Sequence, residues 1–227
     1  MTLARRVKRI TCGRCVRPQS ACICRWITPT VHWLEVVVLQ HPLEQHCAKG
    51  SAQLLHLSLS RSRMVTGEVF AEGDLRALLR DPFAPGAAAD DAKHPILLYP
   101  QNPADKPAAS PLSTEFFRDP SRLRLIVIDG TWRKSRKMLH CNPLLQQLPR
   151  FSLHDVPTSR YPIRKAHRVD QLSTLEATCL ALTQLEGNAA RFAPLLNAFN
   201  GFVAQQVVQR EAGMSATTQS RHNSIQL

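Results

Sequence analysis

The chain has 227 residues, which is enough for one full domain with a small appendage. Its hydrophobic content of 44% is normal for a globular protein and excludes general disorder. Lysine and arginine total 29 against 17 acidic residues, so the net charge of +12 predicts a polyanionic partner, with nucleic acid ahead of an anionic membrane surface. No apolar run approaches the ~20 residues that cross a bilayer, and no export signal follows Arg5-Arg6, so we expect a cytoplasmic protein with no membrane association.

The first 25 residues hold seven lysines and arginines, no acid and four of the seven cysteines. Two close cysteine pairs within thirteen residues are typical of a compact tetrahedral zinc site, and coincidental cysteines are the alternative. Four thiolates leave no open position on the metal, so the site is expected to be structural and to supply folding energy that burial cannot. The sequence therefore predicts a separate zinc-binding module over residues 1–30, with the ligands Cys12, Cys15, Cys22 and Cys24.

Strand and helix signals alternate from residue 33 onward. They predict an α/β protein with a parallel sheet over 31–210, in which ligands bind beyond the carboxyl ends of the strands. That rule points at the loops 41–44, 99–102 and 129–132. A Pro/Ala-rich stretch over 81–94 resembles an insertion, and 211–227 is expected to be a disordered tail. In chain order we expect strands at 33–39, 65–70, 95–100, 123–129 and 151–156, and helices at 51–59, 75–79, 133–145, 173–185 and 192–208.

The most apolar strand ends in a short polar motif, Asp129-Gly130-Thr131-Trp132. A carboxylate, a glycine, a hydroxyl and an aromatic ring thus fall where an α/β protein binds its ligand. Asp129 has the chemistry to bind a cationic or hydroxyl-bearing ligand or to take a proton. The alternative is a helix N-cap with Trp132 packed in the core, and spacing alone does not decide between the two.

Positive charge recurs close to these loops. We expect it to form a track for a phosphate backbone, with Tyr161 or Trp132 available for base stacking; a solvated basic face is the alternative. The helix start at Ser173-Thr174 reads as a capping box with Glu176. His41 and Glu44 form a possible acid/base pair. The predicted RNA-binding residues are Arg133, Lys134, Arg136, Lys137, Arg160, Tyr161, Arg164 and Lys165.

Taken together, these motifs resemble the DTW-domain family of tRNA-uridine aminocarboxypropyltransferases. The family name comes from an Asp-x-Thr-Trp motif, here at 129–132. The other similar elements follow in order along the chain: the cysteine pattern of 12–24 with Arg17-Pro18, His41-Pro42-Leu43-Glu44, Tyr99-Pro100, the loop 160–165 and Ser173-Thr174-Leu175-Glu176-Ala177.

The resemblance implies a SPOUT-like α/β fold with a C-terminal trefoil knot, a rare exception among protein chains. It also implies S-adenosylmethionine as donor, tRNA as partner and structural zinc, while monomer and dimer both stay open, with the monomer favoured. Asp129, Thr131 and Trp132 are then expected to be catalytic. The donor is expected to bind at Tyr99, Pro100, Asp129, Gly130, Ser173, Thr174 and Glu176.

The expected reaction transfers a 3-amino-3-carboxypropyl group to N3 of a tRNA uridine and releases 5′-methylthioadenosine. Its sulfonium leaving group is already activated, so orientation is the protein's main task. A base helps to remove the weakly acidic N3 proton, and Asp129 is the candidate, unless it binds the donor instead. A SPOUT-type RNA methyltransferase and a non-catalytic zinc-ribbon RNA-binding protein are the alternatives.

Overall fold

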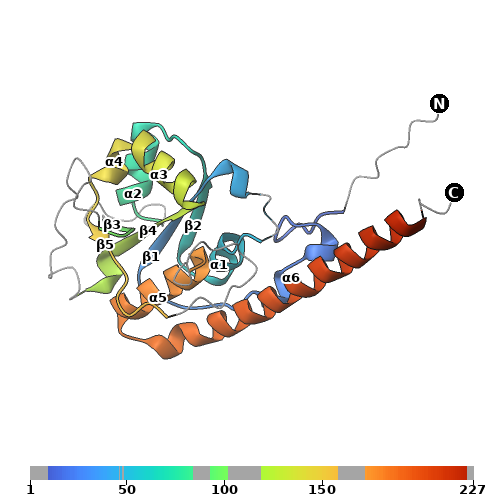
Figure 1. Ribbon diagram of the computed structural model, residues 1–227. Helices are drawn as coiled ribbons and strands as arrows, with labels where there is room; N and C mark the ends of the chain where they lie inside the picture. Colours follow the sequence, from blue (N-terminus) through green and yellow to red (C-terminus); the bar gives the residue numbers. More distant parts are fainter. Residues whose placement is uncertain are drawn as a thin grey trace.

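The computed structural model describes residues 10–45, 47, 49–83, 93–101, 119–157 and 172–223, with side chains of the last helix described as far as Val208. A parallel five-stranded sheet in the order β2-β1-β4-β3-β5 lies between two layers of helices (Figure 1). This arrangement confirms the α/β fold with a parallel sheet. The strands are β1 (Glu35–Gln40), β2 (Ser62–Thr66), β3 (His94–Leu98), β4 (Leu123–Asp129) and β5 (Arg150–Phe151).

The central strands are apolar on both faces, as a sheet covered on both sides requires. Val36 and Val38 of β1 point into one core, which contains residues of α1 (Ala52–Ser58), α5 (Thr174–Glu186) and α6 (Ala189–Asn223). Val37 and Leu39 point into the other core, against α2 (Glu72–Arg80), α3 (Trp132–Cys141) and α4 (Pro143–Gln146). Single 3-10 turns occur at Gln19–Ala21, Cys24–Trp26, Pro42–Glu44 and Pro120–Arg122.

Several elements differ in extent from the sequence prediction. The second strand is β2 at Ser62–Thr66 rather than 65–70, because it pairs in parallel with β1 up to Gln40. The helix expected over 133–145 is interrupted before Pro143, whose missing N–H cannot continue it. The strand expected over 151–156 shortens to β5, because its partner β3 ends at Leu98, and Asp155 beyond it has a positive φ of 46°.

The last helix is longer than predicted, since α6 continues to Asn223 rather than 208. Helix therefore extends into the segment 211–227, for which a disordered tail was expected. Figure 1 shows α6 running past the sheet and along the N-terminal cysteine segment. The approach to α5 over 158–171 lies outside the described residues, so the trefoil knot stays a prediction. None of the described helices combines the length and apolarity of a membrane span.

The cysteine segment packs on the rest of the molecule. Cys15 and Ile23 are buried in the same apolar core as the sheet residue Val36. The Trp26 indole donates a hydrogen bond of 2.5 Å to the Gln205 side chain on α6. The Trp26 ring also occupies the space that a Cβ on Gly201 would need. The division of the chain at residue 30 stays a prediction, while the contacts show that this segment and α6 share one core.

A buried ion pair lies at the end of the sheet where β1 and β4 begin. Arg124 is fully buried and donates to the Glu35 carboxylate through Nε, at 3.0 Å, and through Nη2. It also donates to the backbone carbonyls of Leu78 and Asp81 at the end of α2. Burial lowers the pKa of Arg124, and its hydrogen bonds to Glu35 oppose that change. A buried charge needs such partners, so the pair sets how α2 meets the two strands.

We expect Gly201→Ala to destabilise the protein, because its methyl group would overlap the Trp26 ring. Overpacking of this kind costs about 1–3 kcal/mol, measured as a lower free energy of unfolding in urea. Gly73→Ala in α2 is the matched control, since nothing lies within 4 Å of its added methyl. The control should be neutral or stabilising by roughly 0.5–1 kcal/mol. Equal stability of the two variants would show that Trp26 does not dock on α6.

Candidate functional site

The carboxyl ends of β1 and β4 lie side by side near the middle of the sheet. These neighbouring strands are in register up to the pair Gln40 and Asp129. After β1 the chain leads to α1 on one face of the sheet, and after β4 it leads to α3 on the other. Open α/β sheets bind their ligands where two loops diverge in this way, and we refer to this place, between the loops after β1 and β4, as the crevice. The loops 41–44 and 129–132, selected from the sequence, therefore do meet at this point.

The carboxylate of Asp129 lies in this crevice, 5% exposed. One oxygen accepts a hydrogen bond of 3.0 Å from the Gln40 side chain. The other accepts one of 2.6 Å from the Thr174 hydroxyl at the start of α5. These two bonds come from segments far apart in sequence, so three segments, that of Asp129 included, meet at the carboxylate.

The residues after Asp129 have distinct structural roles. Thr131 is the N-cap of α3, and its hydroxyl accepts a hydrogen bond of 3.4 Å from the Lys134 amide. The helix-cap interpretation of this residue therefore holds. A Cβ on Gly130 would lie 3.2 Å from the Lys134 Cβ, which is a tight contact. Gly130 thus allows α3 to begin close to the end of β4.

Trp132 does not pack into the core. It is 49% exposed and meets the Tyr99 ring edge-on, with 5.6 Å between the ring centroids. The Arg150 guanidinium lies 5.0 Å from the centroid of the Tyr99 ring. Pro100 follows at the surface. The loop after β3 and Trp132 thus form an aromatic pair close in sequence to Asp129, and the Trp132 ring remains partly open to solvent.

The start of α5 is a capping box, as the sequence predicted. The Ser173 hydroxyl accepts from the Glu176 amide, and the Glu176 carboxylate accepts from the Ser173 amide. The Leu175 amide donates to the Ser51 hydroxyl of α1. The side chains of Ser173 and Glu176 and the Leu175 amide thus have hydrogen-bond partners within the protein. The Thr174 hydroxyl is the group at this helix start that contacts Asp129.

His41 and Glu44 do not pair with each other. His41 accepts the Leu43 amide through Nδ1, so its Nε2 carries the proton that is donated to Glu68 at 2.8 Å. Glu68 also pairs with Lys137 at 2.8 Å. The hydrogen bond from Lys137, and after it the one from His41, lowers the pKa of Glu68. The contact with Glu68 in turn raises the pKa of Lys137. Separately, Glu44 pairs with Lys134 at 2.7 Å.

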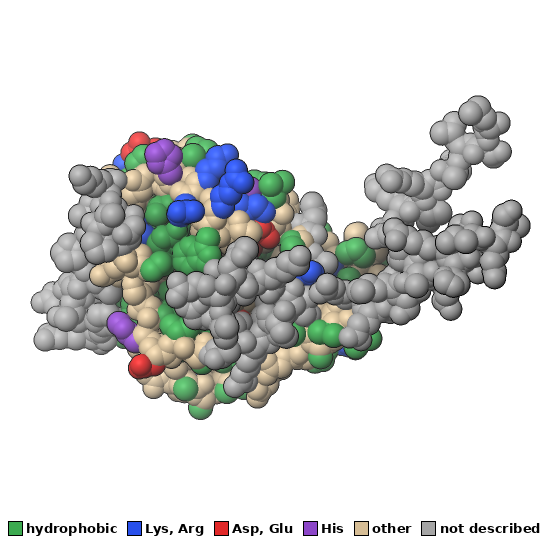
Figure 2. Space-filling model, in the orientation of Figure 1, with side chains coloured by type: hydrophobic (Ala, Val, Ile, Leu, Met, Phe, Trp, Pro, Cys, Tyr) green, Lys and Arg blue, Asp and Glu red, His purple; other side chains and the backbone are tan. Residues whose placement is uncertain are grey.

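The basic start of α3 divides into two kinds of residue. Lys134 and Lys137 hold the loops after β1 and β2 through these ion pairs. Arg133 and Arg136 are exposed and have no ion-pair partner in the described part of the chain. Figure 2 shows lysine and arginine side chains gathered on this face, beside apolar ones. The other predicted RNA-binding residues, Arg160, Tyr161, Arg164 and Lys165, lie outside the described residues.

The four predicted zinc ligands do come together. Their sulfur atoms all lie within 4.8 Å of one another, and no other such cluster occurs in the described ranges. The backbone amides of Cys15 and Arg14 lower the pKa of the Cys12 thiol to about 6. Desolvation by burial raises the pKa of the Cys24 thiol to about 12. Four sulfur donors at this spacing fit a tetrahedral zinc ion and leave it no open position.

Several residues of the crevice escaped the sequence analysis. Gln40 carried one usable signal, because it is a polar residue that ends an apolar strand. Glu68 follows β2, whose end was misplaced, so no pattern connected it with His41. Arg150 and Ser51 gave no signal, since their partners come from distant segments.

Comparison with known proteins supports a single family. The model of the DTW domain family matches residues 9–207. The mouse protein named tRNA-uridine aminocarboxypropyltransferase 2 is 29% identical over 80% of this chain, and the match spans 58% of the mouse protein's length. The Drosophila melanogaster protein of the same name is 29% identical over 79% of the chain and 68% of its own length. The Arabidopsis thaliana tRNA-uridine aminocarboxypropyltransferase A is 27% identical over 61% of the chain and 53% of its own length. No solved structure gives a significant match.

We expect one zinc ion per wild-type chain, measured by elemental analysis of purified protein. Cys24→Ser should lose the metal and unfold at a lower temperature, because metal binding contributes folding energy. Cys47→Ser is the control, since Cys47 is outside the cluster. Metal retention by the Cys24 variant, or a wild-type chain that a chelator does not destabilise, would contradict the assignment.

Proposed function

Because the chain belongs to the DTW domain family, we propose that it transfers the 3-amino-3-carboxypropyl group of S-adenosylmethionine to N3 of a tRNA uridine. Its relatives are named tRNA-uridine aminocarboxypropyltransferases, which supports a tRNA uridine as acceptor and this transferred group. The observation that carries the proposal is the Asp129 carboxylate, held by Gln40 and Thr174 in the crevice beside an exposed tryptophan. The SPOUT-like knot and a location in the cytoplasm are part of the same proposal.

The proposed reaction is a displacement at carbon. The N3 lone pair forms a bond to the terminal carbon of the aminocarboxypropyl chain as the bond from that carbon to sulfur breaks. Sulfur keeps the electron pair and leaves as the neutral thioether of 5′-methylthioadenosine, and the N3 proton goes to a base or to water. The sulfonium centre offers a methyl carbon as well, so the site must select the carbon that faces the acceptor.

In this proposal Asp129 holds the donor. Its two oxygens accept hydrogen bonds from Gln40 and Thr174, and these bonds fix the orientation of the carboxylate. A fixed carboxylate of this kind suits the donor's ammonium or ribose hydroxyl groups. Tyr99, Pro100 and Gly130 form the neighbouring wall, and Ser173 and Glu176 keep Thr174 in place through the capping box.

The acceptor would enter from the side of Trp132. The reacting N3 lies on the edge of the base that pairs with adenine, so the uridine has to be unpaired and turned out. An indole that is 49% exposed offers a surface for stacking such a base. Arg133 and Arg136 lie exposed on the same helix, without ion-pair partners among the described residues, and would contact phosphates. Zinc would stabilise the basic N-terminal segment and take no part in the transfer.

The reaction product provides a direct test. Incubation of the protein with S-adenosylmethionine and unmodified tRNA should yield 5′-methylthioadenosine and a uridine heavier by one aminocarboxypropyl group, both measured by mass spectrometry. S-adenosylhomocysteine with a methylated base would instead identify a methyltransferase. Binding of tRNA with neither product would identify a non-catalytic RNA-binding protein.

We expect Asp129→Asn to weaken donor binding by about ten- to a hundredfold, because a charge-assisted hydrogen bond contributes ~1.5–3 kcal/mol. Thr174→Val should have a smaller effect, because it leaves the carboxylate in place and removes one of its partners. Asp74→Asn, on the exposed side of α2, is the charge control. Titration calorimetry with S-adenosylmethionine measures all three. Unchanged donor affinity together with lost turnover in Asp129→Asn would identify Asp129 as the base.

A further inference from the structure

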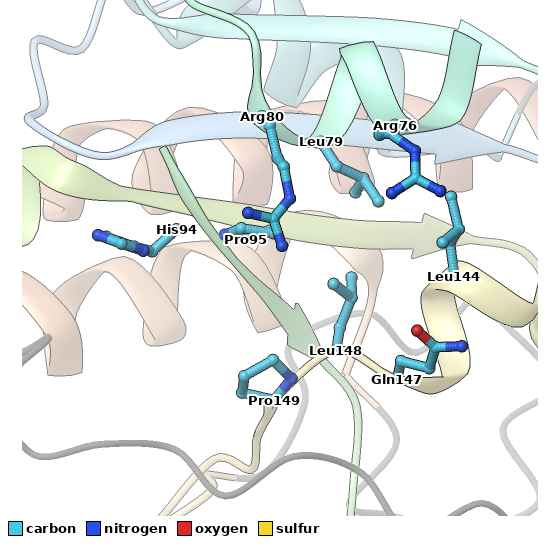
Figure 3. Close-up of a pocket in the computed structure, with 9 residues that line it drawn as sticks. All are labelled: Arg76, Leu79, Arg80, His94, Pro95, Leu144, Gln147, Leu148 and Pro149. Atoms are coloured by element: carbon cyan, nitrogen blue, oxygen red, sulfur yellow. The ribbon is translucent and has the colours of Figure 1, made fainter. Parts of the chain in front are cut away.

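A cavity of about 310 Å³ opens at the other edge of the sheet, between the end of α2, α4 and the start of β3 (Figure 3). The first residue of β3 pairs with Leu123, the first residue of β4. Asp129 is 129 − 123 = 6 residues further along β4, which corresponds to on the order of 20 Å. This cavity is therefore separate from the crevice around Asp129, and its size is at the lower end of small-molecule sites.

The walls of the cavity combine two kinds of group. Leu79, Leu144, Leu148 and Pro149 provide apolar surface on opposite sides of the opening. The guanidinium groups of Arg76 and Arg80 extend over it from α2 (Figure 3). Such a site suits a flat apolar group joined to an anion. Leu79 and Leu148 are almost fully buried, so the apolar part belongs to a built core and is not a loose surface patch.

The two arginines are available to an anion. Arg80 is exposed, and its guanidinium has no hydrogen bond or ion pair within the described residues. Arg76 contacts Glu72 at 2.6 Å, one turn away, but both side chains are largely exposed, so solvent screens this pair. An arginine guanidinium can donate two parallel hydrogen bonds to phosphate oxygens. The contact with Glu72 occupies one nitrogen of Arg76 and leaves other N–H groups for an anion.

The surroundings of the cavity are positive. The described residues that line it include no aspartate or glutamate. Burial lowers the pKa of His94 at the rim, and the nearby Arg122 and Arg80 lower it further. The lowered pKa favours the neutral form of His94, so the positive charge at the cavity comes from the arginines. With a net charge of +12 for the whole chain, this is a place that attracts phosphate.

We propose that this cavity binds one nucleotide unit of the substrate RNA, with its phosphate between Arg76 and Arg80 and its base against the half-buried Leu144 and Pro149. The inference rests on the proposed function, since it assigns a second contact to the same tRNA. Contacts to phosphate position a nucleic acid without reading its sequence. A contact on the order of 20 Å from Asp129 would thus set the register of the RNA body while the target uridine enters the crevice.

Cytidine 5′-monophosphate is the probe for the cavity itself, because it lacks the adenosine of the donor. We expect the full, zinc-loaded chain to bind it in calorimetry, with S-adenosylmethionine present at saturation. Arg80→Ala should weaken binding about tenfold, the loss expected for one charge-assisted contact. Glu72→Gln should tighten binding, because it frees Arg76. Asp74→Asn removes the same charge from α2 away from the cavity and should change binding far less.

The contact with tRNA is tested by kinetics. Arg80→Ala should raise the KM for tRNA several-fold and leave kcat and donor affinity unchanged. Arg133→Ala should also raise the KM, but should bind cytidine monophosphate like the wild type. Thermal unfolding shows that each variant is folded, and both arginines are at the surface.

The outcomes separate the two proposals. If the wild type forms 5′-methylthioadenosine but Arg80→Ala leaves both nucleotide affinity and the KM for tRNA unchanged, the cavity assignment is overturned and the proposed function stands. If nucleotide affinity falls and the KM does not, the cavity binds free mononucleotides, and the assignment to RNA is wrong. If no transfer product forms, the proposed function fails, and weaker tRNA binding by Arg80→Ala in a filter assay would still support the contact.

Discussion

One buried carboxylate connects the parts of the molecule that form the crevice. Asp129 is the last residue of β4. Its carboxylate accepts hydrogen bonds from Gln40 at the end of β1 and from Thr174 at the start of α5. A carboxylate that is 5% exposed is costly unless it accepts hydrogen bonds, so each segment must reach its place for the others to be stable. The capping box at Ser173 and Glu176 then holds the Thr174 hydroxyl in the required position.

The two central strands are held by polar side chains at both ends and by apolar packing between them. Where they begin, Arg124 joins Glu35 to the end of α2, and where they end, Gln40 meets Asp129. Between these contacts the β1 residues alternate between two apolar cores. An anchored strand pair of this kind is a suitable support for the proposed transfer, which depends on the orientation of its reactants.

Exposed positively charged side chains lie at both ends of the strands. Asp129 and the exposed indole lie at the carboxyl ends of the strands, and Arg133 and Arg136 on α3 are exposed with no ion-pair partner among the described residues. Arg76 and Arg80 place further positive charge at the opposite end of the strands. The proposed RNA substrate is larger than the crevice, and contacts at two separated places would hold it in one orientation.

The amino-acid sequence by itself determined the local features of this protein. The strand 123–129, the capping box at Ser173 and the cysteine cluster all follow from residue spacing within one short segment, and the structure confirms them. The ordered motifs also identified the family, which the match over 9–207 confirms. Tertiary structure alone decided the partners of these features. His41 pairs with Glu68 rather than Glu44, Asp129 is held by Gln40 and Thr174, and Trp26 fits against Gly201. Such partners are up to 175 residues apart (201 − 26), and only the packing of the sheet and its helices brings them within contact distance.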